Sequence, residues 1–367
     1  MQFFNDTYRN RRVFLTGHTG FKGGWLACWL CRWLNAKVCG FSDDQKTEPH
    51  HYSLLRYSLL KDSLNIDNRY GDVRDYDAVC RSMHEFRPEI VFHLAAQPLV
   101  RRSYKEPLET FSTNALGTAN VLQAARQCDS VKAVIVITTD KVYENLEVQR
   151  GYKETDILGG HDPYAASKAC AEIVVNSFRR SFYESEHKLL ASCRAGNVVG
   201  GGDWAEDRLI PDLVRSAARG DTTFIRMPGA VRPWEHVLEP LSGYLLLGQY
   251  LLEGKSEFAE AWNFGPDSES NVTVGEVVRT ASAIWNKIKV DVSTEPQPHE
   301  TTLLMLDCEK AKTRLNWQPI WNLQETIDFT IRWYQEFYEK NEIVTFQQLE
   351  RFFEDAQKCG ATWIKAG

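Results

Sequence analysis

Residues 13–23 read Val13-Phe14-Leu15-Thr16-Gly17-His18-Thr19-Gly20-Phe21-Lys22-Gly23, and this segment is the strongest indicator of the architecture. The apolar run 13–16 predicts a buried strand, and residues 22–34 predict the helix that follows it. The glycines between them permit a tight turn and let the backbone approach a pyrophosphate, whose charge a helix N-terminus stabilises. A strand, a glycine-rich turn and a helix in this order predict a dinucleotide-binding unit. The residues expected to contact the dinucleotide are Gly17, His18, Thr19, Gly20, Phe21, Lys22 and Gly23.

The first half of the chain alternates short apolar runs with helical patterns. Almost continuous apolar runs such as 133–137, Ala-Val-Ile-Val-Ile, predict strands that are buried on both faces of a parallel sheet. We therefore predict the α/β class, with a Rossmann-type doubly wound parallel sheet. The expected strands are 13–16, 37–41, 90–94, 133–137 and 189–193, and the expected long helices are 108–127 and 164–182.

Beyond Arg194 the pattern changes to shorter elements with more glycine and proline. This change predicts a smaller, discontinuous α/β lobe that binds the substrate. The last residues, 357–367, have little periodicity and are expected to be a loosely held end of the chain. The predicted domains are a dinucleotide-binding Rossmann domain at 1–193 with 237–262 returning to it, a substrate domain at 194–236 and 263–345, and a tail at 346–367.

Composition and charge exclude several classes of function. The 367 residues carry a net charge of −6, with 25% charged residues, so no basic field exists to hold nucleic acid or a membrane surface. Residues 1–12 are polar, and the apolar run 245–252 is too short to cross a bilayer, so we expect a cytoplasmic protein. Among the nine cysteines only Cys28-x-x-Cys31 is closely spaced, without a second CxxC or a His pair. We interpret it as helix packing, and expect neither a disulfide framework nor a metal site.

Acidic residues follow two of the predicted strands. Asp43 and Asp44 come after the strand 37–41, where a carboxylate can bind the adenosine ribose hydroxyls and favours NAD over NADP. A solvated acidic loop explains the same two residues equally well. Asp72 follows a third predicted strand and is expected to hold the adenine amine.

Two further motifs carry reactive side chains. In Tyr164-Ala165-Ala166-Ser167-Lys168 a phenol and an ammonium lie one helical turn apart, and a nearby cation helps a tyrosine to act as a base. Thr139-Asp140-Lys141 follows the strand 133–137 directly, at the edge where open parallel sheets bind ligands. Asp140 is a candidate general acid. With the glycine-rich turn, these motifs predict hydride chemistry on an alcohol.

The motifs together resemble the extended short-chain dehydrogenase/reductase superfamily, and within it the sugar-nucleotide 4,6-dehydratases that act on CDP-D-glucose. The resemblance runs from about Arg12 to about Trp333. Lys141 is its most discriminating residue, because relatives that act on dTDP-glucose carry Glu after the Asp. The segments that carry it are 17–23 (GHTGFKG), 95–101 (AAQPLVR), 139–141 (TDK), 159–164 (GGHDPY), 194–204 (RAGNVVGGGDW) and 225–240 (IRMPGAVRPWEHVLEP).

The resemblance implies a lyase reaction in which NAD is not consumed. Tyr164, supported by Lys168, removes the proton of the sugar C4 hydroxyl as hydride moves to NAD, and Thr139 binds the C4 oxygen. Asp140 protonates the departing C6 hydroxyl, and hydride then returns to C6. Lys141 is either the base that removes the C5 proton or a group that stabilises the enolate. The product would be CDP-4-dehydro-6-deoxy-D-glucose, an early step toward the 3,6-dideoxyhexoses of bacterial surface polysaccharide such as the lipopolysaccharide O-antigen.

The resemblance also implies which residues surround the two ligands, and a homodimer or higher homo-oligomer. Superfamily relatives pair two helices of each subunit, here 108–127 and 164–182, into a four-helix bundle. Further cofactor contacts are expected from Val73, Leu94, Ala95, Ala96, Tyr164 and Lys168, and contacts to the sugar nucleotide from Gln97, Asn197, Arg208, Arg232, His236, His299 and Glu300.

Three alternatives remain open at this point: a dehydratase for another nucleotide sugar, a C4 epimerase, and a non-catalytic dinucleotide-binding scaffold. Epimerases of the superfamily share the Tyr-x-x-x-Lys step but need no Asp-Lys pair to expel a hydroxyl. A scaffold needs no acid at C6.

Overall fold

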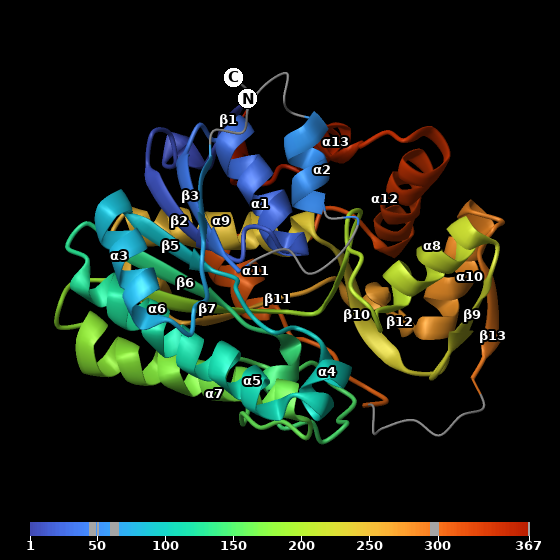
Figure 1. Cartoon of the computed structure of the whole chain (residues 1–367), viewed down its shortest axis with the longest axis horizontal. Coiled ribbons are helices and arrows are strands. Elements are labelled where there is room, and N and C mark those ends of the chain that lie inside the picture. The colour runs from blue at the N-terminus through green and yellow to red at the C-terminus, as the bar shows by residue number, and fades with distance from the viewer. Residues whose placement is uncertain (44–48, 50, 59–65, 294–300, 366–367) are drawn as a thin grey trace.

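The computed structural model describes residues 1–43, 49, 51–58, 66–293 and 301–365. Its centre is a seven-stranded parallel sheet with the strand order β11-β7-β6-β5-β2-β3-β4 (Figure 1). The predicted doubly wound parallel fold is confirmed. The strands are β2 (Arg12–Thr16), β3 (Lys37–Ser42), β4 (Ile66–Tyr70), β5 (Ile90–His93), β6 (Ala133–Ile137), β7 (Leu189–Ala195) and β11 (Ala261–Phe264).

Helices cover both faces of this sheet, because alternate residues of each strand point to opposite sides. Phe92 and Ile135 belong to a core that includes residues of α1 and α9, whereas their neighbours Val91 and Val134 belong to a second core with α3, α6 and α7. The bounds are α1 (Phe21–Arg32), α3 (Tyr76–Phe86), α6 (Gly117–Gln127), α7 (Pro163–Phe178) and α9 (Leu238–Leu252).

Both predicted long helices are present, each with one wider turn. The helix expected at 108–127 consists of α5 (Pro107–Phe111), the π-helical turn η2 (Ser112–Leu116) and α6. The helix expected at 164–182 is α7, extended by a second π-helical turn, η4 (Arg179–Tyr183). In both cases the hydrophobic periodicity predicted the helix but not the wider turn within it.

Shorter elements beyond residue 195 gather beside the carboxyl edge of the central sheet (Figure 1). They include a three-stranded sheet, β12-β10-β8, and a two-stranded one, β13-β9. Segment 237–262 contains α9, which contacts β6, and the first half of β11, which pairs with β7. The domain boundaries themselves remain a prediction. The elements are β8 (Asn197–Val199), α8 (Leu209–Arg219), β9 (Thr222–Ile225), β10 (Val231–His236), β12 (Asn271–Thr273), α10 (Val274–Ile284), β13 (Lys289–Val292) and α12 (Leu323–Gln335).

The expectation of a loosely held C-terminal end is wrong. Helix α13 (Thr345–Lys358) leads to β14 (Ile364–Lys365), which pairs antiparallel with β1 (Gln2–Phe3), and Figure 1 shows the two ends of the chain side by side. Trp363 is 2% exposed and stacks on Phe4, with ring centroids 5.3 Å apart. Aromatic burial holds this segment, and a segment of this length is too short for periodicity to reveal it.

None of the helices in the described part of the chain is long and apolar enough to cross a membrane. Smaller elements complete this part of the chain. They are η1 (Phe4–Asp6), α2 (His51–Ser58), α4 (Val100–Lys105), η3 (Asp140–Val142), η5 (Ser256–Phe258), η6 (Ser268–Ser270), α11 (Glu309–Leu315) and η7 (Glu336–Lys340).

Candidate active site

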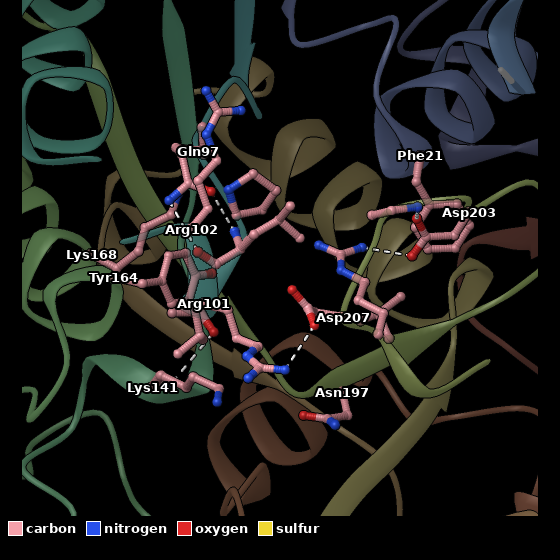
Figure 2. A pocket seen from close by; sticks show the side chains of 18 of the residues that line it. Phe21, Gln97, Arg101, Arg102, Lys141, Tyr164, Lys168, Asn197, Asp203 and Asp207 are labelled. Carbon is pink, nitrogen blue, oxygen red and sulfur yellow. Dashed lines mark hydrogen bonds and ion pairs between the residues drawn. The ribbon is translucent and has the colours of Figure 1, made fainter. Parts of the chain in front are cut away.

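A cavity of about 1530 Å³ opens where β2, β5 and β6 end and the shorter elements begin. Open parallel sheets place ligand sites at this edge. Figure 2 shows Tyr164, Lys168 and Lys141 on one side of it, and Asn197 and Asp203 on the other. The predicted cofactor residues that line it are Gly17, Thr19, Gly20, Phe21, Lys22, Gly23, Asp43, Asp72, Val73, Leu94, Ala95 and Ala96.

The glycine-rich turn between β2 and α1 needs its glycines. Gly17 has a φ of +74°, and a Cβ atom there would lie 2.7 Å from the backbone nitrogen of Ala95. A Cβ atom on Gly23 would lie 2.0 Å from the carbonyl oxygen of Gly17. The turn therefore has no side chain at Gly17, Gly20 or Gly23 and leads directly into α1, which begins at Phe21. Such a turn presents backbone N–H groups to an anion, and so it fits the diphosphate of a dinucleotide.

His18 does not line the cavity, although it lies within this turn. Its ring is fully buried behind the turn, with Nδ1 2.9 Å from Oγ of Ser42 and Nε2 3.0 Å from Oδ1 of Asn68. The prediction of a cofactor contact from its side chain is corrected: His18 ties the turn to β3 and β4. The motif gave its position in sequence but not the direction of its side chain.

The acidic candidates near the cofactor region differ in their surroundings. Asp43 follows β3 and lines the cavity with an exposed side chain. Asp72 also lines it, and its carboxylate pairs with the guanidinium of Arg74 at 2.5 Å. Asp44 lies outside the described residues. The predicted contacts to ribose and adenine remain predictions.

The Thr139-Asp140-Lys141 turn follows β6 and forms the short helix η3. Thr139 caps it, with Oγ1 accepting from the backbone N–H of Lys141 at 3.4 Å. The same hydroxyl donates to Oδ1 of Asp140 at 2.9 Å. Asp140 is 1% exposed, and burial raises the pKa of its carboxyl, against the opposing charge of Lys141. A buried carboxyl with a raised pKa keeps its proton more readily and is suited to act as a general acid.

Tyr164 and Lys168 lie in the first turns of α7, which begins where Asp162 accepts a hydrogen bond from the N–H of Ala165 and where Pro163 occupies the first helical position. Both side chains are buried, at 8% and 5% exposure. The Lys168 ammonium donates to the carbonyl oxygen of Ile137 at 3.1 Å, which brings α7 to the end of β6.

Burial dominates the ionisation of this pair. It raises the pKa of Tyr164 to about 12, opposed first by a hydrogen bond with Thr139 and then by the charge of Arg208. Burial also lowers the pKa of Lys168 to about 8, together with the neighbouring charge of Lys22. The sequence-based expectation of a tyrosine with a lowered pKa is therefore not met in this state, because desolvation of the phenolate outweighs the nearby positive charges.

The predicted substrate residues fall into two groups. Asn197, Arg208 and Arg232 line the cavity, as does Gln97. Arg208 pairs with Asp203 at 2.7 Å. The amide of Gln97 is engaged inside the protein: Nε2 donates to Leu99 O and Thr110 Oγ1, and Oε1 accepts from the N–H of Leu99. His299 and Glu300 lie outside the described residues.

His236 is a second correction. It is 0% exposed, does not line the cavity, and packs edge-on against Trp25 and Trp321, with ring centroids 5.8 and 4.8 Å away. Burial lowers the pKa of its imidazole to about 3, so the ring is neutral. Its proposed contact with the sugar nucleotide is withdrawn. In β10 the flanking pattern did not indicate which face each residue occupies.

Sequence reasoning missed the charged residues behind the site. Glu172 and Arg194 form a buried ion pair behind the turn 139–141, and Asp207 pairs with Arg101 at 3.1 Å in the cavity wall (Figure 2). One signal was available for Glu172, because it follows Lys168 by one helical turn and shares its face.

Comparison with known proteins places the chain. A family model described as GDP-mannose 4,6 dehydratase matches residues 14–330. The chain belongs to this family. It is 46% identical over 334 residues to a CDP-glucose 4,6-dehydratase of Salmonella typhimurium, which covers 89% of this chain and 91% of that protein. The resemblance to the sugar-nucleotide 4,6-dehydratases is thereby confirmed.

More distant relatives in the family's neighbourhood share the fold. A UDP-glucose 4-epimerase of Mycoplasma pneumoniae is 25% identical over 79% of this chain and 88% of its own. A solved dTDP-glucose 4,6-dehydratase of Bacillus anthracis in complex with NAD superposes with a TM-score of 0.74 at 22% identity, covering 90% of this chain and 100% of that one. The epimerase Mth375 of Methanothermobacter thermautotrophicus superposes with a TM-score of 0.77 at 23% identity, covering 92% and 96%.

Proposed function

We propose that this chain is a lyase that converts CDP-D-glucose to CDP-4-dehydro-6-deoxy-D-glucose and water, with NAD as a cofactor that is regenerated in every turnover. One observation carries the proposal: the buried carboxyl of Asp140, which accepts a hydrogen bond from Thr139, and the buried phenol of Tyr164 line the same cavity. The base proposed for oxidation at C4 and the acid proposed for elimination at C6 therefore share one site. The 46% identity to a CDP-glucose 4,6-dehydratase supports the same substrate.

The glycine-rich turn and the adjoining cavity wall would hold NAD, with Val73, Leu94, Ala95 and Ala96 against the dinucleotide. When bound, NAD supplies the acceptor for a hydride from C4 of the sugar and the donor of a hydride to C6. The close packing of Gly17 on Ala95 leaves no room for any side chain at the diphosphate.

Tyr164 is the proposed base for the C4 hydroxyl. Burial keeps its phenol protonated at rest, so its proton must leave in concert with events at the substrate. The side chain of Thr139 and the charge of Arg208 oppose that cost by stabilising negative charge at the phenol. Thr139 is also the proposed hydrogen-bond partner of the C4 oxygen.

Asp140 is the proposed acid for elimination. Burial raises the pKa of its carboxyl, the direction that favours donation of a proton to the C6 hydroxyl, which is a poor leaving group when it is not protonated. Lys141 neighbours Asp140 and lines the same cavity. Lys141 either removes the C5 proton as a neutral amine or stabilises the enolate as an ammonium.

The proposed contacts to the sugar nucleotide are Asn197, Arg208 and Arg232, which all line the cavity. The two arginines suit the diphosphate, because guanidinium groups pair with phosphate through two parallel hydrogen bonds.

We further propose a homodimer that forms through the paired long helices. Leu108, Leu116 and Ile173 on these helices are 84%, 63% and 59% exposed, an apolar surface that water disfavours. The cytoplasmic location remains a prediction.

The test is a product analysis. Purified protein is incubated with CDP-D-glucose and a trace of NAD, and the products are followed by NMR and by the absorbance of NADH. Formation of the 4-dehydro-6-deoxy sugar without net NADH supports the proposal. A C4 epimer, conversion of the added NAD to free NADH, or turnover of dTDP-glucose or UDP-glucose in place of CDP-D-glucose would overturn it.

A further inference from the structure

A buried ion pair lies directly behind the catalytic turn. Nη2 of Arg194 is 2.8 Å from Oε2 of Glu172, and the two side chains are only 4% and 3% exposed. Glu172 comes from α7 and Arg194 from β7. Replacing a buried pair by apolar residues is often harmless to stability, so burial alone gives no reason for this pair to be charged.

The partners of the pair indicate what it does. Oε1 of Glu172 accepts a 2.5 Å hydrogen bond from the hydroxyl of Thr138. Nη1 of Arg194 donates a 2.9 Å hydrogen bond to the hydroxyl of Tyr143. Thr138 and Tyr143 stand immediately before and after the segment 139–142, which contains the reactive turn. The ion pair therefore holds the turn at both of its ends.

Further contacts anchor each end of this arrangement. Oε2 of Glu172 also accepts from the hydroxyl of Ser192 at 2.8 Å, and the hydroxyl of Tyr143 donates to Oδ1 of Asn263 at 2.6 Å. Ser192 and Asn263 lie on the neighbouring strands β7 and β11. The turn is thus tied through one polar network to the strands β7 and β11, and Nη1 of Arg194 also donates to the carbonyl oxygen of Glu154 at 3.3 Å.

Helix α7 contacts the end of β6 twice. Lys168 donates to the carbonyl of Ile137, and one turn later Glu172 accepts from Thr138. Residues four apart on a helix lie on one face, so these two contacts fix the position of α7 along its axis relative to the end of β6. That position determines where the phenol of Tyr164 on α7 lies relative to Thr139 on the turn.

We propose that Glu172 and Arg194 are positioning residues for the reaction, which hold the turn 139–141 and the helix that bears Tyr164 and Lys168 in register. The inference rests on the proposed function of this site. Neither side chain is expected to touch the substrate, because neither lines the cavity.

The pair also acts on the charge of Lys168. The titratable groups that face its ammonium are Lys22 of α1, Glu172 of α7 itself and His93 of β5, and burial holds the pKa of His93 at about 3, so that ring is neutral. Glu172 is then the anion that opposes the loss of the ammonium proton. Without its charge Lys168 would lose its proton at a lower pH, and the basic limb of the pH–kcat profile would move to lower pH.

The experiment compares four variants with the wild-type holoenzyme. Glu172→Gln removes the charge. Thr138→Val removes the hydroxyl that donates to Glu172, and Tyr143→Phe removes the hydroxyl that accepts from Arg194, each with little change of volume. Glu186→Gln is the control. Glu186 pairs with Arg126 at 2.6 Å in a half-exposed ion pair on α6 and beyond η4. The measurements are kcat and KM against pH with CDP-D-glucose, and hydrogen exchange of the peptide that spans 138–143 in the protein without substrate.

For Glu172→Gln we expect kcat to fall by about 10- to 100-fold and KM to stay within twofold, as for a catalytic group displaced by a fraction of an ångström. We also expect the basic limb of its pH–kcat profile to move to lower pH. Thr138→Val and Tyr143→Phe should lower kcat without displacing the limb, and all three should speed exchange at 138–143. Glu186→Gln should match wild type.

An unchanged kcat and an unchanged exchange rate at 138–143 in Thr138→Val and Tyr143→Phe would overturn the proposal, even if Glu172→Gln fails to fold. Faster exchange throughout the protein with a lower melting temperature and an unmoved pH profile in Glu172→Gln would show a purely structural role and also overturn it. Because the exchange measurement needs no substrate, it separates failure of this inference from failure of the proposed function.

Discussion

The hydroxyl of Thr139 donates a 2.9 Å hydrogen bond to Oδ1 of Asp140, while Oδ2 of the same carboxyl is buried and has no hydrogen-bond partner among the described residues. A buried polar atom without a partner is costly, and such atoms concentrate at functional sites. A carboxyl with one oxygen held and the other unmatched is oriented and yet still available to a ligand.

Asp140→Asn should separate oxidation from elimination. The amide keeps the shape of the side chain but has no proton of suitable acidity for the C6 hydroxyl, so elimination should slow by about 10²–10⁴-fold, as when a general acid is lost. Bound NADH should still form, and deuterium at C5 of the substrate should still exchange with solvent. Single-turnover absorbance and NMR measure the two steps. Glu206→Gln, an exposed carboxylate in the same cavity wall, is the control. Elimination at the wild-type rate would exclude Asp140 as the acid.

Tyr164→Phe should stop the reaction earlier. Without the phenol no base takes the C4 proton, and the first appearance of bound NADH should slow by about 10²–10⁴-fold. Affinity for CDP-D-glucose, measured by calorimetry, should stay near that of wild type because the ring remains. Tyr104→Phe, in which the hydroxyl is removed from a 42% exposed side chain on α4, should leave both quantities unchanged. Normal NADH formation in Tyr164→Phe would contradict the assignment.

Stability should fall in mild acid because two buried histidines cannot accept protons. Burial holds the pKa of His93 and of His236 at about 3, below the value of about 6.5 expected when the chain is unfolded. Their contribution is therefore present above pH 6.5 and is lost as pH falls toward 3. Each such group adds a slope of up to about 1.4 kcal/mol per pH unit to the free energy of unfolding in that window.

His236→Phe should remove one of these slopes. Phe fits between Trp25 and Trp321, although the backbone N–H of Leu238 loses its 3.3 Å contact with Nδ1. Urea unfolding at pH 7, 6 and 5 measures the change, and His187→Asn, at an exposed position with a φ of +54°, should keep the wild-type slope. The same pH dependence in His236→Phe as in wild type would show that His236 is not responsible.

The central sheet was predictable because its signal is local. Apolar runs located β2, β3, β5, β6 and β7 to within about two residues, since strands buried on both faces must be apolar throughout. The glycine turn and the Tyr164–Lys168 step also follow from spacing alone. These features require no knowledge of what lies across the sheet.

What the sequence did not reveal depends on side-chain direction and on distant partners. His18 and His236 lie in motifs that adjoin the cavity, but their rings point into the interior. The contact of Glu172 with Arg194 joins residues 22 positions apart on different elements. Likewise, burial raised the pKa of Tyr164 where a neighbouring cation alone predicted the opposite direction. Each of these properties arises from packing in three dimensions.

The proposed dimer can be tested on α7. Ile173→Glu places a charge on a side chain that is 59% exposed in the single chain, so folding should be unaffected, whereas burial of that charge between subunits would be costly. Light scattering at micromolar concentration should give a dimer for wild type and a monomer for the variant. Val292→Glu, on β13 and 49% exposed, is the matched control and should remain dimeric. A monomeric wild type, or a dimeric Ile173→Glu, would reject this interface.

Trp363→Ala should destabilise the protein although it lies close to the end of the chain. The indole ring packs between Phe4, Trp29 and Phe352, with centroid distances of 5.3, 5.6 and 5.9 Å. Truncation of a buried Trp typically costs about 3–5 kcal/mol in the free energy of unfolding. Urea titration measures it, with Phe224→Ala, 63% exposed, as the control. A loss below about 0.5 kcal/mol, the usual range for surface positions, would mean that the segment is not held.

The pairing of β1 with β14 also has a consequence for how the chain matures. Phe3 must wait for Ile364, its partner in the strand pair, to be synthesised. At about 5–20 residues per second that interval is roughly 20 to 70 seconds. Throughout it the aromatic face of α1 that α13 and Trp363 finally cover has no partner, although the strands that it packs on are already made. A nascent chain in this condition exposes Trp29 of α1 to its surroundings until α13 and Trp363 have been made.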